Sequence, residues 1–192
     1  MKKTIVLLIL CLAMAPLLAQ DKPDAARQKA MDAYMKAGAV TENHEFLKKY
    51  AGTWDCQVKG WMAPGQPPTV SQGSFQGDMR LDGRYLFMDF KGEMFGQPFN
   101  GLQIIGFDNM QQKYITLWID NTSTFFFTTL GTRQDNVISE TGLWPDPLTG
   151  AQAPVKARTT WVNADEYLYE QFMVMPDKSE FKSMEMSCKR LK

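Results

Sequence analysis

Residues 53–59 read Thr-Trp-Asp-Cys-Gln-Val-Lys, and at this stretch the period of the sequence changes. Trp54, Cys56 and Val58 are apolar, and the residues between them are polar. An alternation with a period of two is typical of a β-strand that turns one face to a core. We therefore expect a strand over residues 53–61 and a β domain that begins with it.

The same alternation returns in nine further segments. The expected strands are 53–61, 70–80, 84–92, 98–107, 113–120, 123–131, 136–143, 154–163, 166–175 and 179–189. Most links are too short for the crossover helix that parallel strands need, and the Asp82-Gly83 link is typical of a hairpin turn. Closing an antiparallel meander removes its exposed edges. The sequence predicts a mainly β fold: an antiparallel up-and-down barrel of about ten strands with a short N-terminal helical segment.

The residues before the first strand favour helix. Residues 23–37 are rich in alanine, and Gly38 ends that segment. Asn43 is the expected N-cap of a second short helix that reaches Tyr50.

Two loops contain several prolines, residues 62–68 and 144–154. Proline removes a backbone donor, so we expect no regular strand in either loop. They lie either at a barrel mouth or on the surface as rigid connectors.

The N-terminus has the features of an export signal. Two lysines precede an apolar run, residues 5–18, and Ala19 follows it closely. The run is too short to span a bilayer as a permanent helix. We expect cleavage after Ala19; a lipid anchor on Cys11 and a retained membrane anchor are the alternatives.

We expect the chain to consist of three parts. We expect a signal peptide at 1–19, a helical and partly flexible lead at 20–42, and the barrel domain at 43–192. The mature protein is expected to be exported, to the periplasm or the outside of a bacterium.

The composition excludes several partners. Lys and Arg total 21, as do Asp and Glu, and losing the two lysines of the signal leaves a slightly acidic chain without a basic patch for nucleic acid. No second apolar run could cross a membrane, so we expect no transmembrane segment in the mature chain. Its oligomeric state cannot be predicted from these features.

The sequence contains one histidine, His44, before the expected barrel. A zinc site needs three or four ligands, and His44 has no partner at a suitable spacing. A Ser-His-Asp triad or a haem site inside the barrel would need a histidine there, and the expected barrel strands contain none. No phosphate loop or dinucleotide fingerprint occurs. We therefore predict no metal and no cofactor, and favour a function without catalysis.

Cys56 and Cys188 share the inward parity of the first and last strands. Those strands are neighbours in a closed meander, so the two side chains can meet. An exported protein can keep a disulfide. The alternative is two buried thiols that act as small apolar residues.

The strand at 113–120 has two unlike faces. Tyr114, Thr116, Trp118 and Asp120 form a mixed aromatic and polar face, which we interpret as a pocket lining. The aliphatic face is then expected against a helix or the rest of the core. The full set of candidate ligand-binding residues is Trp61, Arg84, Tyr114, Trp118, Asp120, Trp144, Arg158 and Glu170. For the charged members, a structural ion pair or plain exposure is the alternative.

Several motifs carry a family resemblance. They are HEFL (44–47), GTW (52–54), PGQPP (64–68), LDGRYL (81–86), GQPFNG (96–101), GFDN (106–109), YITLWID (114–120) and ST (123–124). Over residues 43–190 the chain resembles the bacterial family called domain of unknown function 1579, in the calycin, or lipocalin-like, superfamily. The resemblance implies a calycin barrel whose first tryptophan, Trp54, plugs the closed end, and it gives Arg190 the place of the arginine that packs on that tryptophan. It implies no activity, and an aromatic residue is common in the family where Cys188 stands here.

Three functions remain. Our first hypothesis is a binding protein for a small, mainly apolar or amphipathic ligand inside the barrel. The second is an enzyme that uses barrel groups, with Asp120, Glu170 and Tyr114 as candidate acid–base residues. The third is an interaction or structural module with a filled barrel.

Overall fold

The computed structural model describes residues 24–94, 96–146 and 149–191, and the expected signal peptide lies outside them. The chain divides into two compact units, one that ends at Met35 and one that begins at Lys36. Helix α1 (Ala25–Ala37) crosses this boundary and buries none of its residues. All structure discussed below belongs to the second unit.

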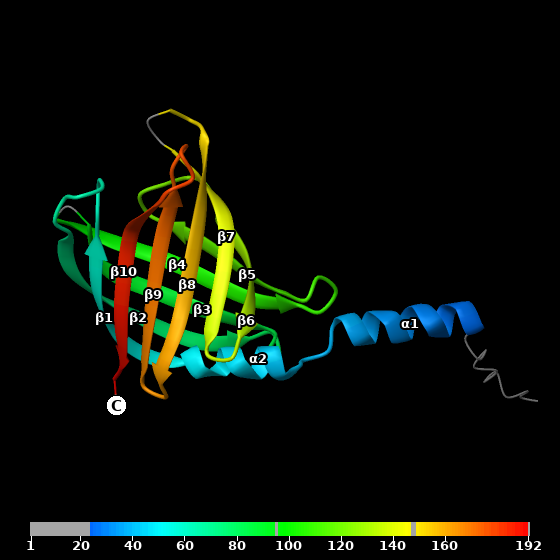
Figure 1. Ribbon diagram of the computed structural model, residues 1–192. Coiled ribbons are helices and arrows are strands. Elements are labelled where there is room, and N and C mark those ends of the chain that lie inside the picture. Colours follow the sequence, from blue (N-terminus) through cyan, green and yellow to red (C-terminus); the bar gives the residue numbers. More distant parts are fainter. Residues whose placement is uncertain (1–23, 95, 147–148, 192) are drawn as a thin grey trace, which may run out of the picture. The chain divides into compact units, whose positions relative to one another are not determined.

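The second unit confirms the predicted ten-strand antiparallel barrel (Figure 1). Each strand pairs with its neighbours in sequence, and β1 pairs with β10 to close the ring. The strands are β1 (Gly52–Gly60), β2 (Thr69–Arg80), β3 (Tyr85–Met94), β4 (Gln97–Asp108), β5 (Lys113–Asp120), β6 (Phe127–Gln134), β7 (Val137–Pro145), β8 (Gln152–Asn163), β9 (Glu166–Val174) and β10 (Glu180–Arg190).

A short helical segment, α2 (Glu42–Leu47) followed by the 3₁₀ turn η1 (Lys48–Tyr50), precedes β1. The predicted N-cap, Asn43, is wrong: the cap is Thr41, whose extended backbone donates its N–H to His44 Nδ1 at 3.0 Å. Asn43 lies in the first turn, and its side-chain oxygen accepts a hydrogen bond from Tyr114 at 3.0 Å. The lone histidine therefore has a structural part in starting α2.

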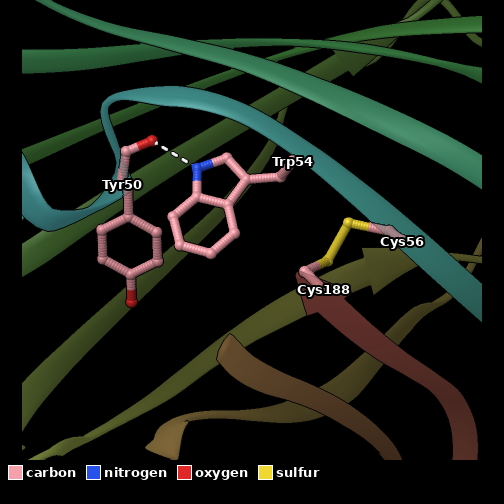
Figure 2. Close-up of a disulfide and its surroundings, with 4 residues drawn as sticks. All are labelled: Tyr50, Trp54, Cys56 and Cys188. Carbon is pink, nitrogen blue, oxygen red and sulfur yellow. Dashed lines mark hydrogen bonds between the residues drawn. A yellow bond between two sulfur atoms is a disulfide. The ribbon is translucent and has the colours of Figure 1, made fainter. Parts of the chain in front are cut away.

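One end of the barrel is closed by an aromatic cluster around Trp54. Trp54 is fully buried, and its indole N–H donates to the carbonyl of Tyr50 at 2.8 Å (Figure 2). Its ring lies against Trp161 and Tyr167, with centroid distances of 5.6 and 4.9 Å. The guanidinium of Arg190 lies 4.2 Å from the Trp54 ring centroid. The end that contains Trp54 is therefore filled with side chains.

The seam between the first and last strands is covalently joined. Cys56 and Cys188 are register partners of β1 and β10, and the structure holds a disulfide between them (Figure 2). Both residues are fully buried beside the Trp54 cluster. The strand pair that closes the ring thus has a covalent bond as well as its ladder of hydrogen bonds.

Two expected boundaries are wrong. β6 begins at Phe127 and runs to Gln134, so it starts and ends later than the expected 123–131. Asp120 holds the preceding loop in a turn by accepting hydrogen bonds from the backbone and hydroxyl of Thr122. At the other end, Asp135 adopts a positive φ of 54° and makes a tighter turn than predicted.

The long proline loop is also shorter than expected, because β7 and β8 continue into it. β7 reaches Pro145, and β8 starts at Gln152 and includes Pro154. Pro154 is the register partner of Leu143 near the start of β8, where a missing backbone donor is tolerated best.

The mixed face of β5 points into the barrel, and the aliphatic face points outward. Tyr114 and Thr116 are buried, whereas Ile115, Leu117 and Ile119 are only half-buried and lie outside the core cluster. Two of their register partners on β4, Ile104 opposite Leu117 and Leu102 opposite Ile119, are half-buried too. The expectation that this aliphatic face packs into the core is therefore wrong: it forms an apolar outer wall of the barrel.

Candidate functional site

The inward-facing side chains are not equally covered along the barrel axis. At the Trp54 end they are completely buried, as for Trp161 and Tyr167, each 4% exposed. Towards the opposite end the inward faces of the strands keep intermediate exposure. These residues are Val58, Phe99, Gln103, Trp118, Trp144, Gln171, Met173, Met184 and Met186. The barrel is thus filled at one end and accessible at the other.

A small cavity of about 30 Å³ lies between these two halves. Its lining includes the apolar side chains of Phe75, Ile105, Ile138 and Met186. The polar members of the lining, called the polar wall below, are Tyr50, Gln103, Tyr114, Thr116, Glu140, Thr159, Tyr167 and Tyr169. A space of this size holds one or a few water molecules or one small polar group.

Glu140 on β7 is the acidic residue of this wall. Its Oε1 accepts hydrogen bonds from the hydroxyls of Thr116, at 2.7 Å, and Thr129, at 2.8 Å. Across the ladder stands Gly131, where a Cβ would lie 2.4 Å from Glu140 Cγ, so glycine leaves room for the carboxyl side chain. Among the described residues none donates a hydrogen bond to Oε2, and no basic side chain pairs with Glu140.

Burial controls the ionisation of this group. It raises the pKa of Glu140 above the usual range of a carboxyl, and the two threonine hydrogen bonds oppose that rise. Burial also raises the pKa of Tyr50 and of Tyr169, so both stay neutral phenols beside it. In the polar wall, burial therefore favours the neutral forms of the carboxyl group and of the phenols.

Aromatic side chains line the accessible half above the cavity. Trp118 lies near Phe90 and Phe99, with ring centroids 6.1 and 6.2 Å apart. Gly101 lies under the Trp118 ring, and a Cβ there would stand 2.3 Å from Cη2. A second group follows on β6 and β7, where Trp144 lies 4.9 Å from the ring of Phe127. Together these rings form one side of an apolar inner wall.

Asp120, at the mouth end of β5, orients Trp118. Its Oδ2 accepts the indole N–H of Trp118 at 2.9 Å, and its Oδ1 holds Thr122. Burial alone would raise the pKa of Asp120, but hydrogen bonds from Thr122 and Trp118 bring it below its ordinary value. Asp120 is thus an ionised carboxylate that positions the aromatic wall.

Two candidate residues lie on the outside of the barrel. Arg158 and Glu170 are register partners on β8 and β9, one position away from the inward-facing Thr159 and Tyr169. They form an ion pair, and Glu170 also accepts from Lys182 at 2.6 Å. Burial acts to raise the pKa of Glu170, and the bonds from Lys182 and Arg158 lower it overall. Their observed contacts are those of a wall-stabilising pair.

Two further candidates are also outside the interior. Trp61 follows β1, donates its backbone N–H to Ser183 and borders a shallow surface cleft with Phe181. Arg84 lies in the turn before β3, where its Nε donates to the carbonyl of Gly38 at 3.0 Å. Neither lines the barrel cavity.

The three candidate acid–base residues do not share a site. Tyr114 and Asp120 are on the same strand, near its two ends, and so lie about 20 Å apart at the usual rise per residue. Glu170 points to the other side of the wall. The structure therefore brings together Tyr114 with Glu140, and Trp118 with Asp120, but not the proposed catalytic set.

Comparison with known proteins identifies the family. A family model described as "Protein of unknown function (DUF1579)" matches residues 39–190. The chain belongs to this family. The DUF1579 barrel is similar to the crystal structure of Rv2717c from M. tuberculosis, with 12% identity, a TM-score of 0.59, and coverage of 80% of this chain and 100% of that one.

A redesigned β-barrel, b11L5F_LGL, also matches the DUF1579 barrel, with 12% identity, a TM-score of 0.42, and coverage of 76% of this chain and 95% of the other. No curated protein matches the sequence. At 12% identity the M. tuberculosis structure shows the fold alone.

Sequence reasoning missed Glu140, the most distinctive residue inside the DUF1579 barrel. The inward positions of β7 are Ile138, Glu140 and Gly142, and the outward ones include Val137 and Leu143. Both faces mix apolar and other residues, so the sequence does not indicate which face points inward. The available signal was Gly131 in the neighbouring strand, since an inward glycine marks space for a partner side chain.

Within the described part of the DUF1579 chain, no group of three or more His, Cys, Asp or Glu side chains is placed to hold a metal ion. Over the same residues, no helix has the length and hydrophobicity that crossing a membrane requires.

Proposed function

We propose that this protein binds a small, mainly apolar ligand in the accessible half of its barrel. The observation that carries the proposal is the exposure of the inner wall at that end. Trp118, Phe99 and Met184 face the barrel axis and are only half-buried, whereas their counterparts at the Trp54 end are buried. A partly exposed apolar inner wall with a few polar groups beneath it is typical of a small-molecule site.

The opposed walls suit a flat or chain-like apolar group. Aromatic rings lie on β3 to β7, and flexible methionines, Met173, Met184 and Met186, lie on β9 and β10. Methionine side chains adapt to irregular shapes because they are unbranched and polarisable. The rings supply a rigid surface, and the methionines can close against the bound molecule.

The test uses N-phenyl-1-naphthylamine, an uncharged apolar probe whose fluorescence rises in apolar surroundings. We expect saturable binding to the full chain. Trp118→Ala should weaken it by about tenfold, because truncating a central aromatic contact costs more than about 1 kcal/mol. The matched control is Trp61→Ala, which removes an indole outside the barrel and should leave the affinity unchanged.

The fluorescence titration gives a clear answer. Absence of a saturable signal in the unmodified protein contradicts the proposed function. An equal loss of affinity in Trp118→Ala and Trp61→Ala places the probe outside the barrel and also contradicts it. Circular dichroism of each variant establishes that it is folded before its affinity is compared.

We further propose that the protein works after export from the cytoplasm. The signal-like residues 1–19 support this, and so does the disulfide between Cys56 and Cys188, because such bonds persist mainly in oxidising compartments. Cell fractionation with N-terminal sequencing tests the proposal. A full-length, reduced protein in the cytoplasmic fraction contradicts it.

A further inference from the structure

The polar wall of the cavity has a chemistry of its own, separate from the aromatic wall above it. Glu140 is 7% exposed and contributes to the lining, and both of its hydrogen bonds end on Oε1. Among the described residues, Oε2 has no protein donor or cation as a partner. Oε2 is not one of the completely buried polar atoms that lack a partner in the described residues, so it borders open space that water or a ligand group can fill.

We propose that Glu140 recognises the polar end of the ligand, and that this end is an uncharged group with a hydrogen-bond acceptor, such as an alcohol or a carboxamide. The inference rests on the proposed function, since it concerns the same interior. It assigns the cavity to the polar end and the aromatic half to the apolar body. The ligand class is then a neutral amphiphile.

The charges around the cavity support a neutral ligand. The cavity wall includes four tyrosines, two threonines and a glutamine, and it includes no Lys, Arg or His. A carboxylate placed there would lose its hydration without gaining a cation, which costs far more than burying a neutral group. An ammonium group could form an ion pair there only if Glu140 were ionised, and burial disfavours that ionisation.

The protonation state of Glu140 supports the same conclusion. Burial raises its pKa, so the protonated form persists to higher pH than that of an exposed carboxyl. Thr116 and Thr129 donate to Oε1, which leaves Oε2 to carry the proton and donate it in a hydrogen bond. The polar end of the ligand accepts that bond.

The space and its position fit one small polar group. A volume of about 30 Å³ admits a hydroxyl or an amide, and it does not admit an alkyl chain or a ring. Gln103 and Met186 line the cavity and are themselves half-buried, so the cavity borders the accessible half. A bound amphiphile can therefore place its head at Glu140 and its tail beside Trp118.

The experiment measures displacement of N-phenyl-1-naphthylamine by four molecules with the same chain: 1-decanol, decanamide, decanoate and decylamine. At pH 7 we expect the two neutral compounds to displace the probe at concentrations at least about tenfold lower than the two ions, given the cost of burying an unpaired charge. Raising the pH through the ionisation of Glu140 should weaken decanamide binding.

Two variants separate recognition from packing. Glu140→Gln keeps an acceptor for the threonines and a donor for the ligand, so it should bind decanamide with an affinity that no longer changes with pH. Glu140→Leu removes the donor and should weaken decanamide by about tenfold, while the probe itself binds as before. If Glu140→Leu does not fold, the pH series of Glu140→Gln against the unmodified protein decides alone.

The outcomes distinguish this inference from the function on which it rests. If the probe binds and decanoate displaces it as well as decanol, the neutral-head inference is overturned and the apolar site stands. The neutral-head inference is also overturned if the affinity of the unmodified protein for decanamide does not depend on pH. If the probe does not bind at all, the proposed function fails, and the inference fails with it.

Discussion

Glu140 shows how one buried carboxyl changes the response of a protein to pH. Its pKa is raised by burial from the ordinary carboxyl value of 4.5. In the interval above 4.5 the folded chain therefore holds a proton that the unfolded chain has released. Rising pH then favours the unfolded state, so this residue lowers the stability of the fold towards neutral pH.

Glu140→Gln should remove that penalty. We expect the variant and the unmodified protein to have similar stability near pH 4.5, and the variant to become progressively more stable as the pH rises above it, because glutamine stays neutral. Urea unfolding at a series of pH values measures the difference. The control is Glu93→Gln, which replaces an exposed carboxyl on β3 and should leave the pH dependence of the unfolding free energy unchanged. If the stability difference between Glu140→Gln and the unmodified protein is the same at every pH, the raised pKa of Glu140 is contradicted.

Arg190 is the second residue whose contacts decide stability. It donates to the carbonyls of Ala51 and Lys49, each at 2.6 Å, and lies over the ring of Trp54. Arg190→Ala should therefore destabilise the fold by about 2–4 kcal/mol, through loss of charged hydrogen bonds and a cation–π contact. Chemical denaturation measures this. The exposed neighbour Lys189→Ala should change stability by less than about 0.5 kcal/mol, and equal effects would show that Arg190 does not hold the closed end.

At the scale of elements, the sequence predicted strands well because hydrophobic alternation is a local property. β1 and β5 both alternate clearly, and the faces expected inside the barrel lie inside it, although the aliphatic face of β5 forms the outer wall instead of packing into the core. Charged residues within strands carried less information: Arg158 and Glu170 could pair inside or outside, and only the register places them outside. The turn at Asp135 was misjudged because a positive φ at a non-glycine residue leaves no strong local signal.

Adjacent positions of β5 should respond in opposite ways to substitution. Thr116→Val removes a hydroxyl that donates to buried Glu140 and should cost about 1–3 kcal/mol. Leu117→Thr, on the outer wall, should stay within about 0.5 kcal/mol. Thermal and urea unfolding of the two variants measure this. A larger loss from Leu117→Thr would mean that the outer wall is covered in solution.

At the scale of the whole molecule, the barrel is a ring of strands whose first and last members are joined by a disulfide. The disulfide links residues separated by 132 positions, so in the unfolded chain it closes a very long loop. A cross-link over such a distance removes much of the conformational freedom of the unfolded state. The last strand is thereby kept beside the first, which is the pairing that costs most to find during folding.

Removing this disulfide should lower the stability of the fold without changing its topology. We expect Cys56→Ala/Cys188→Ala to lose about 2–5 kcal/mol of stability, measured by urea unfolding against the oxidised protein. The oxidised protein should show no thiol accessible to a thiol reagent in denaturant at positions 56 and 188. Two titratable thiols at those positions, or a variant as stable as the oxidised protein, would contradict the bond.

The same bond determines how the protein responds to mechanical force. A pull applied at the two chain ends passes across Cys56 and Cys188, so the loop of 132 positions between them carries no load. At about 3.4 Å per extended residue, roughly 450 Å of contour length stays hidden until a reductant opens the bond. An unfolding machine that draws the chain through a narrow pore therefore has to pass a closed ring of polypeptide instead of a single thread.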